Sequence, residues 1–200
     1  MKPPSPLAEL PIEFLGSFPD PEVRLEPALP EIAFLGRSNV GKSSLLNALV
    51  GKRGFARVSG TPGKTILLNV FRLPALYLLD LPGYGYARAS KSARLGFFKL
   101  ITGVVRRRRA LSGVVWLLDI RHLPSKEDRE FGMLLAEQKT PVLVALTKAD
   151  KLGRGAQMAQ LKELAKELEM PENQFQITSS TTGAGIADLG ASVLAAARTD

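Results

Sequence analysis

The amino-acid sequence predicts a three-layer α/β fold, in which a mainly parallel β-sheet is covered by helices on both faces. From residue 31 onward, continuous apolar runs such as IAFLG (32–36) and GVVWLLDI (113–120) alternate with amphipathic stretches. Such runs are typical of strands buried on both faces, and helices between them connect parallel neighbours. The runs at 65–73 and 76–83 are joined by a tight turn near Pro74, and we expect one antiparallel edge strand.

The chain is long enough for one domain with a substantial core, because it has 200 residues of which 45% are hydrophobic. Eight of its fourteen prolines precede residue 31, so residues 1–30 are expected to form an extended N-terminal arm. Within that arm only residues 12–18 have the composition to join a sheet. Residues 31–200 are expected to form a single domain.

The remaining elements follow from apolar spacing. Helices are predicted over 42–50, 91–109, 125–138, 159–169 and 186–197, a strand running into a loop over 141–150, and a short strand within 175–180. Ser125 is a candidate N-cap, because acidic residues follow it in the first turn.

Composition excludes several kinds of site. There is no cysteine and only one histidine, which excludes disulfides and thiolate chemistry and leaves little for a zinc site. No apolar run approaches the roughly 20 residues needed to span a bilayer, and the first residues show no apolar signal core, so a soluble cytoplasmic protein is expected. The formal net charge of +8 favours polyanionic partners such as nucleic acid, although basic solubility alone also accounts for it.

A phosphate-binding loop is predicted between the first apolar strand and the first helix. Gly36, Gly41, Lys42 and Ser43 fit the pattern G-x-x-x-x-G-K-[ST]. In such loops successive N–H groups and the helix N-terminus face the phosphates, the lysine reaches the β- and γ-phosphates, and the hydroxyl binds Mg²⁺. A glycine-rich turn capped by Ser43 is the plainer alternative.

A magnesium site also needs a carboxylate on a neighbouring strand, usually acting through water. Asp80 ends the run LYLLD and is followed by LPG, in which the Gly83 N–H could sense a γ-phosphate. An aspartate after an apolar strand can also be an ordinary strand terminator, but the neighbouring phosphate loop favours the metal role.

The segment TKAD at 147–150 favours guanine over adenine. A carboxylate at Asp150 can accept hydrogen bonds from guanine N1–H and its exocyclic amine, whereas adenine presents the opposite pattern. Lys148 can lay its stem over the ring, and Thr147 can hydrogen-bond nearby loops. The segment TSS at 178–180 ends the next strand, where a backbone N–H can donate to guanine O6.

These motifs together resemble the EngB family (YihA/YsxC-type) of bacterial ribosome-assembly GTPases, in the translation-factor class of small GTP-binding proteins. The resemblance covers about residues 12–190, and it rests on PEIAFLGRSNVGKSSLLNAL (30–49), TPGKT (61–65), DLPGYGYA (80–87), LLDIRHLPSKED (117–128) and TKADKL (147–152). It implies a P-loop GTPase fold, GTP hydrolysis, action on the precursor of the large ribosomal subunit, and links to the cell cycle and septation.

By this resemblance Thr65 is the threonine that joins Mg²⁺ when the γ-phosphate is present, with Thr61 as its rival in the same loop. The family usually has glutamine after this threonine, whereas Ile66 stands here. Lys42, Thr65 and Gly83 are the expected catalytic residues, and Ser43, Thr65 and, through water, Asp80 the metal ligands. The residues expected to contact GTP are Gly36, Arg37, Ser38, Asn39, Val40, Gly41, Lys42, Ser43, Ser44, Gly63, Lys64, Thr65, Ile66, Leu67, Asp80, Leu81, Pro82, Gly83, Thr147, Lys148, Ala149, Asp150, Thr178, Ser179 and Ser180.

Two segments are expected to respond to the bound nucleotide. Residues 51–65 should form a loop that is ordered by the γ-phosphate and the metal, and a second switch should follow Asp80.

Hydrolysis is expected to be slow without help. Small GTPases often place a water-orienting glutamine after the Asp-x-x-Gly, where this chain has Tyr84. Asn39 matches a position that related GTPases use to bind K⁺, although a simple turn residue is an equal interpretation.

Basic residues gather beside both expected switches: Lys52, Arg53, Arg57, Lys64, Arg88, Lys91 and Arg94. They could let the nucleotide state control contact with an RNA backbone, whereas RRRR at 106–109 also complements a helix dipole. Trp116 is expected in the core, and His122 in a loop-shaping role. The alternatives to a monomeric assembly factor are a P-loop phosphotransferase acting on a small acceptor and a membrane-linked GTPase; neither an Arg-rich lid nor a lipidation motif is found.

Overall fold

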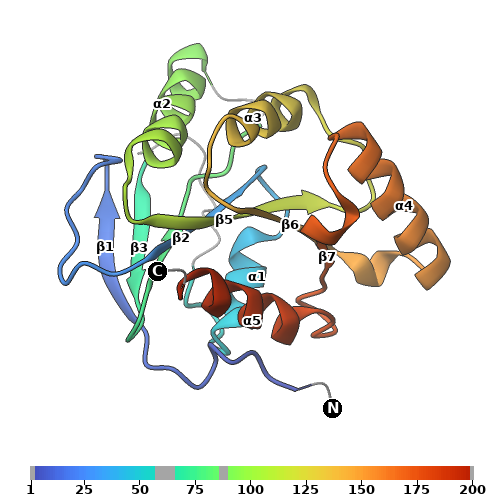
Figure 1. Ribbon diagram of the computed structural model, residues 1–200, viewed down its shortest axis with the longest axis horizontal. Coiled ribbons are helices and arrows are strands. Elements are labelled where there is room, and N and C mark those ends of the chain that lie inside the picture. Colours follow the sequence, from blue (N-terminus) through green and yellow to red (C-terminus); the bar gives the residue numbers. More distant parts are fainter. Residues whose placement is uncertain (1–2, 57–65, 86–89, 199–200) are drawn as a thin grey trace.

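The computed structural model describes residues 3–56, 66–85 and 90–198, and Figure 1 shows how they form a central sheet with helices on both sides. The strands are β1 (Glu13–Phe18), β2 (Glu31–Gly36), β3 (Leu68–Arg72), β4 (Tyr77–Asp80), β5 (Leu111–Asp119), β6 (Val142–Thr147) and β7 (Phe175–Ile177). The helices are α1 (Lys42–Leu49), α2 (Lys91–Arg107), α3 (Lys126–Ala136), α4 (Arg154–Glu167) and α5 (Ile186–Ala196), with short 3₁₀ helices η1 (Ala149–Lys151) and η2 (Glu172–Gln174).

The predicted fold class is confirmed by the sheet, whose strand order is β1-β3-β4-β2-β5-β6-β7. β2 pairs in parallel with β4 and β5, and β6 pairs in parallel with β5 and β7. β3 runs antiparallel to both of its neighbours, β4 and β1. The antiparallel strand is therefore second from the edge, because β1, from the proline-rich first thirty residues, pairs outside it.

The two faces of the sheet carry separate apolar clusters. Along β5, Val114, Trp116 and Leu118 belong to the cluster that includes side chains of α2, α3 and α4, whereas Val115 and Leu117 belong to the cluster of α1 and α5. This alternation is the two-residue period of a strand that is buried on both sides. In the described part of the chain, no helix combines the length and the apolar character that crossing a membrane requires.

Three of the four consecutive arginines at the C-terminal end of α2 (residues 106–109) form ion pairs with glutamates. The Arg108 guanidinium forms a bidentate pair with Glu31 at 2.5 Å and also donates to the Pro21 and Val23 carbonyls, at 2.8 and 3.0 Å. Both side chains of the pair are buried, with 6% and 4% exposed. Arg106 pairs with Glu137 and Arg107 with Glu22 at the surface. Arg108 thereby connects the first thirty residues to β2. Most of the arginines at 106–109 therefore stabilise the fold.

We expect Glu31→Ala to lower the free energy of unfolding by about 3 kcal/mol, because it leaves the Arg108 charge buried without its partner. Glu22→Ala, which breaks the exposed pair with Arg107 in the same run, should cost less than about 1 kcal/mol. Urea unfolding monitored by far-ultraviolet circular dichroism measures both. Equal losses in the two variants would mean that the buried pair has no special structural role.

Candidate nucleotide site at the carboxyl edge of the sheet

The predicted phosphate loop connects the end of β2 to the start of α1. Gly41 is the N-cap of α1 and has a φ of 104°, a left-handed conformation that glycine adopts without steric cost. Asn39, two residues earlier, also has a positive φ, at 63°. The two left-handed residues curl the chain tightly into the helix, so the loop lies across the N-terminus of α1, where unpaired N–H groups attract anions.

Lys42 and Asp80 meet beneath this loop. The Lys42 ammonium pairs with Asp80 Oδ1, and the two side chains are only 11% and 7% exposed. Asn69 Nδ2 donates to Asp80 Oδ2 at 3.1 Å. Asn69 lies directly opposite Asp80 in the antiparallel β3–β4 register, so the hairpin positions both side chains. Sequence reasoning missed Asn69; the available signal was a single amide within the apolar run TILLNVFRL.

The segment that follows Asp80 packs directly on the phosphate loop. A Cβ added to Gly83 would lie 3.1 Å from both the nitrogen and the Cα of Ser38, so a side chain here would push the two backbones apart by a few tenths of an ångström. The Ser38 N–H donates to the Tyr84 carbonyl at 2.7 Å, and the Tyr84 N–H donates to the Gly36 carbonyl at 3.3 Å. Leu81, one of the residues expected to contact GTP, has its side chain in the core.

Tyr84 does not occupy the position of a water-orienting side chain. Its ring is 3% exposed and its hydroxyl donates to Asp128 Oδ1 of α3 at 2.7 Å. The same hydroxyl accepts a hydrogen bond from Trp116 Nε1 at 2.9 Å. Trp116 is fully buried, as expected, and sequence reasoning missed only that its N–H has this partner.

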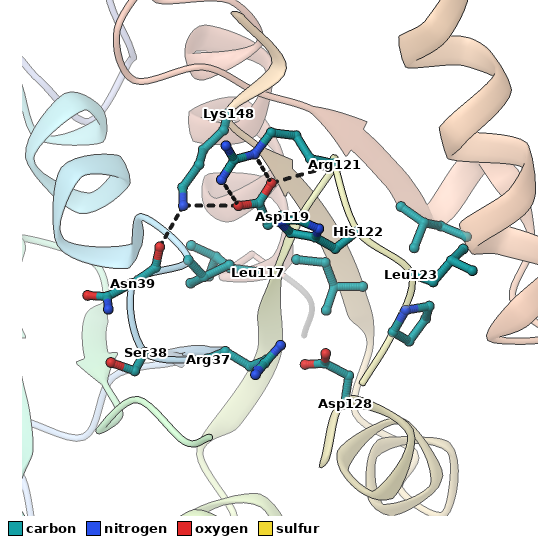
Figure 2. Close-up of a pocket in the computed structure, with 14 residues that line it drawn as sticks. Arg37, Ser38, Asn39, Leu117, Asp119, Arg121, His122, Leu123, Asp128 and Lys148 are labelled. Carbon is teal, nitrogen blue, oxygen red and sulfur yellow. Dashed lines mark hydrogen bonds and ion pairs between the residues drawn. The ribbon is translucent and has the colours of Figure 1, made fainter. Parts of the chain in front are cut away.

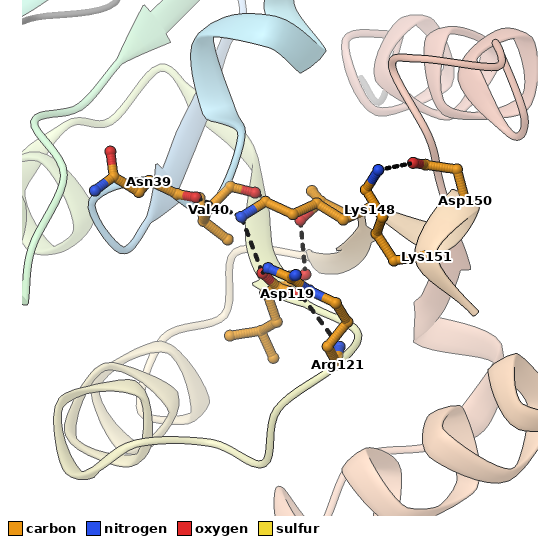
Figure 3. A network of polar contacts seen from close by, with 9 residues as sticks. Asn39, Val40, Asp119, Arg121, Lys148, Asp150 and Lys151 are labelled. Carbon is orange, nitrogen blue, oxygen red and sulfur yellow. Dashed lines mark hydrogen bonds and ion pairs between the residues drawn. The ribbon is translucent and has the colours of Figure 1, made fainter.

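The segment 147–150, which is predicted to recognise the base, is held against the predicted phosphate loop. Thr147 Oγ1 donates to the Val40 carbonyl at 2.7 Å and to the Leu118 carbonyl at 3.1 Å. Lys148 Nζ donates to the Asn39 carbonyl at 2.7 Å and pairs with Asp119 at 3.0 Å (Figure 3). The lysine stem is therefore stretched between the end of β6 and the loop, as a platform for a ring would be.

Asp119 is a second residue that sequence reasoning missed. Burial raises its pKa, but hydrogen bonds from Arg121 and Lys148 outweigh burial and hold the pKa of this carboxyl well below its usual range. Asp119 thus stays charged and anchors Lys148. His122 follows in the same loop, where its N–H donates to the Asp119 carbonyl at 3.1 Å.

Asp150 is oriented by two neighbours. Ser179 Oγ donates to its Oδ1 at 2.7 Å, and Lys151 Nζ lies 3.2 Å from its Oδ2. The hydrogen bond from Ser179 lowers the pKa of Asp150, so the carboxylate is an acceptor at neutral pH. The Ala149 N–H donates to the Thr178 carbonyl at 3.1 Å, which joins the two predicted base-binding segments.

A cavity of about 240 Å³ lies beside the phosphate loop (Figure 2). Its lining includes Arg37, Asn39, Asp119, His122 and Lys148 but not Lys42, Asp80 or Asp150. The Arg37 side chain points toward Asp128 across this cavity, and its Nε is buried without a hydrogen-bond partner among the described residues. Arg37 is thus part of the predicted loop, but its side chain does not join Lys42.

The structure brings Gly36–Ser44, Asp80–Gly83, Thr147–Asp150 and Thr178–Ser180 to one edge of the sheet. Gly63, Lys64 and Thr65 lie outside the described residues, as do Thr61, Arg57 and Arg88. Ile66 is half-buried and packs beside α2, where a Cβ added to Gly96 would lie 2.5 Å from its Cδ1. Leu67 is also half-buried.

Comparison with known proteins supports this arrangement. Residues 31–148 match the family model described as "50S ribosome-binding GTPase". The chain is 44% identical to the probable GTP-binding protein EngB of Desulfatibacillum aliphaticivorans, over 90% of this chain and 85% of that protein. It is 46% identical to that of Gemmatimonas aurantiaca, over 86% of this chain and 84% of the relative.

Solved structures agree. A crystal structure of a probable GTP-binding protein engB superposes with a TM-score of 0.73 at 26% identity, over 84% of this chain and 98% of that one. Aquifex aeolicus Era bound to GDP and aluminium fluoride shares the fold, with a TM-score of 0.67 at 22% identity over 86% of this chain and 58% of the other. The chain therefore belongs to the 50S ribosome-binding GTPases, and among them to the EngB GTP-binding proteins.

Proposed function

We propose that this GTPase is a nucleotide-controlled switch in assembly of the large ribosomal subunit, with GTP bound along the carboxyl edge of the sheet. The observation that carries the proposal is the convergence of Lys42, Asp80, Lys148 and Asp150 from one helix start and two strand ends, those of β4 and β6. Ligands of parallel α/β sheets bind at this edge. A cytoplasmic monomer is the form that we propose.

The phosphates would lie on the loop from Gly36 to Ser44, where the N-terminus of α1 and the Lys42 ammonium supply positive charge. In the structure the Lys42 ammonium pairs with Asp80. When phosphate binds, the ammonium would leave this carboxylate and pair with phosphate oxygens instead. The Gly83 N–H, held close to Ser38, would face the γ-phosphate.

Magnesium fits the oxygen donors of this site. Asp80 would hold the ion through water, together with the hydroxyls of Ser43 and Thr65, and the ion would neutralise charge on the β- and γ-phosphates. One carboxylate and two hydroxyls suit Mg²⁺, which retains water and takes phosphate oxygens in nucleotide sites.

Guanine would lie over the Lys148 stem, with its N1–H and exocyclic amine donating to Asp150. The hydrogen bond from Ser179 and the contact with Lys151 keep that carboxylate charged and aimed. A backbone N–H within Thr178–Ser180 would donate to guanine O6. Adenine would present a donor to this N–H and no donor to Asp150, so it would be rejected.

Intrinsic hydrolysis would be slow, because the side chain that follows Gly83 is turned into the core and cannot orient water. Asn39 could supply help through K⁺. Its carbonyl is taken by Lys148, and its side-chain amide points away from that lysine (Figure 2), free to bind a cation beside the phosphates. A fixed positive charge there would stabilise the charge that develops during phosphoryl transfer.

Contact with ribosomal RNA would use the exposed face of α2. The helix sequence KSARLGFFKLITGVVRR contains no acidic residue. Lys91, Arg94 and Lys99 are exposed beside Leu95 and Phe98, which are 62% and 46% exposed. α2 follows the segment after Asp80, so the γ-phosphate could control this basic surface, and binding would depend on phosphate contacts and on salt.

Asp150→Asn should weaken GDP binding by about 10- to 100-fold and improve xanthosine diphosphate binding, because it replaces an acceptor by a donor. Titration with fluorescent analogues of both nucleotides measures the exchange. Asp188→Asn, the same change at an exposed position of α5, should alter neither affinity. Unchanged guanine affinity in Asp150→Asn would refute the base assignment.

The rate of GTP hydrolysis should be about tenfold higher in potassium than in sodium buffer if K⁺ binds at Asn39, because the ion would add positive charge beside the phosphates. Asn39→Ala should abolish the difference while Lys42 keeps the nucleotide bound. Single-turnover phosphate release in matched ionic strength is the measurement. Equal wild-type rates in the two salts would remove the cation from the mechanism.

Wild-type protein should co-sediment with purified large ribosomal subunits more strongly with a non-hydrolysable GTP analogue than with GDP. The double variant Lys91→Glu/Lys99→Glu should bind about tenfold more weakly, because it reverses charge at phosphate contacts. Lys162→Glu/Lys166→Glu carries the same charge change on the exposed side of α4 and is the control. Equal binding of both variants would exclude α2, and no state-dependent binding by wild type would exclude the assembly role.

A further inference from the structure

Tyr84 is the point at which the segment after Asp80 enters the protein core. Its hydroxyl is shared between two buried groups, the Asp128 carboxylate at 2.7 Å and the Trp116 indole N–H at 2.9 Å. Its ring packs on Phe131 of α3, with ring centroids 4.4 Å apart. Tyr84, Trp116 and Asp128 are 3%, 0% and 3% exposed, so solvent cannot replace any of these contacts.

Asp128 is held rigidly from its other side. Its Oδ2 accepts from the Ser125 N–H at 2.8 Å and from the Ser125 hydroxyl at 2.7 Å, as part of the capping box that begins α3. Only Oδ1 faces Tyr84. The hydroxyl is therefore fixed by a carboxylate that cannot turn without uncapping the helix.

The backbone of Tyr84 is fixed to the phosphate loop. Its carbonyl accepts from the Ser38 N–H and its N–H donates to the Gly36 carbonyl. One residue thus connects α3 and β5, through its side chain, to the phosphate loop, through its backbone. The side-chain bonds and the backbone bonds of Tyr84 together fix the position of Gly83, the residue immediately before it.

Loss of the hydroxyl contacts would be costly. A shift of the Gly83–Tyr84 backbone by about an ångström would leave a buried carboxylate oxygen and a buried indole N–H unpaired. Burial raises the pKa of Tyr84 well above its ordinary value, so the hydroxyl keeps the proton that it donates. These contacts favour one defined placement of Gly83 over a range of placements.

We propose that Tyr84 is a positioning residue for GTP hydrolysis: its buried hydroxyl, held by Trp116 and Asp128, sets the Gly83 N–H at the γ-phosphate end of the phosphate loop. Tyr84 itself touches no substrate. The inference rests on the proposed GTP site and adds what places Gly83. A second consequence concerns Trp116, the only tryptophan of the chain, which shares the hydroxyl and therefore reports on this segment.

The test is Tyr84→Phe, with Tyr77→Phe as the matched control. Tyr77 is also fully buried on β4, and its hydroxyl donates to the Pro27 carbonyl at 2.9 Å, far from the phosphate loop. Both variants delete one buried hydroxyl. Tyr84→Phe should lower kcat for GTP about tenfold while the affinity for GDP changes less than about twofold, and Tyr77→Phe should leave both unchanged. Thermal unfolding shows whether the two variants lose similar stability.

Tryptophan fluorescence gives an independent readout. The Trp116 emission of wild type and of Tyr77→Phe should differ between the GDP state and the state with a non-hydrolysable GTP analogue, and the difference should shrink in Tyr84→Phe. A wild-type emission that is identical in the two nucleotide states would overturn the coupling between this cluster and the γ-phosphate.

A second variant reaches the same hydroxyl from α3. Asp128→Asn should also lower kcat, because an amide cannot accept from both the Tyr84 hydroxyl and the Ser125 groups, whereas Asp188→Asn, the same change at an exposed position of α5, should leave kcat unchanged. Wild-type kcat in both Tyr84→Phe and Asp128→Asn, with normal guanine binding, would overturn this inference and leave the proposed function in place. Failure of wild type to bind GTP would overturn both.

Discussion

The register of β2 between its two parallel neighbours is the constraint on which the site depends. Phe34 lies opposite Asp80 of β4, and Gly36 lies opposite Leu117 of β5. Because all three strands run in the same direction, the loops that leave their carboxyl ends emerge at one edge. A slip of one residue would move Asp80 away from Lys42 and turn the apolar side chains of β2 to the wrong faces.

The same edge is held together by hydrogen bonds between loops. Thr147 and Lys148 donate to carbonyls of the phosphate loop, and Tyr84 bonds to the backbone of Gly36 and Ser38 in that loop. These bonds give partners to backbone carbonyl and N–H groups of the loop. The result is a loop whose shape is imposed by several strands and does not depend on its own glycines alone.

Charge serves two different purposes in this molecule. Arg108, and to a smaller degree Arg106 and Arg107, are paired with glutamates and hold the N-terminal residues and α3 in place. Lys91 and Lys99 on α2 carry no acidic partner among the described residues and remain at the surface. The formal net charge of +8 therefore overstates the number of arginines that are available to contact an RNA backbone.

The order of strands and helices could be predicted from the sequence alone, and so could the placement of the predicted phosphate loop, Asp80 and the segment 147–150 at one edge of the sheet. Those features are local: an apolar period, a glycine spacing or a short motif at a strand end contains the whole signal. The register-dependent partners were decided only by the tertiary structure. Asn69 meets Asp80 across a hairpin, Asp119 meets Lys148 across two strands, and Tyr84 turns into the core to reach Asp128, which lies 44 residues further along the chain. The edge position of β1 and the burial of Arg108 were also decided only by the tertiary structure. The burial of a side chain and its distant hydrogen-bond partner depend on which elements pack over it, and no local sequence pattern encodes this packing.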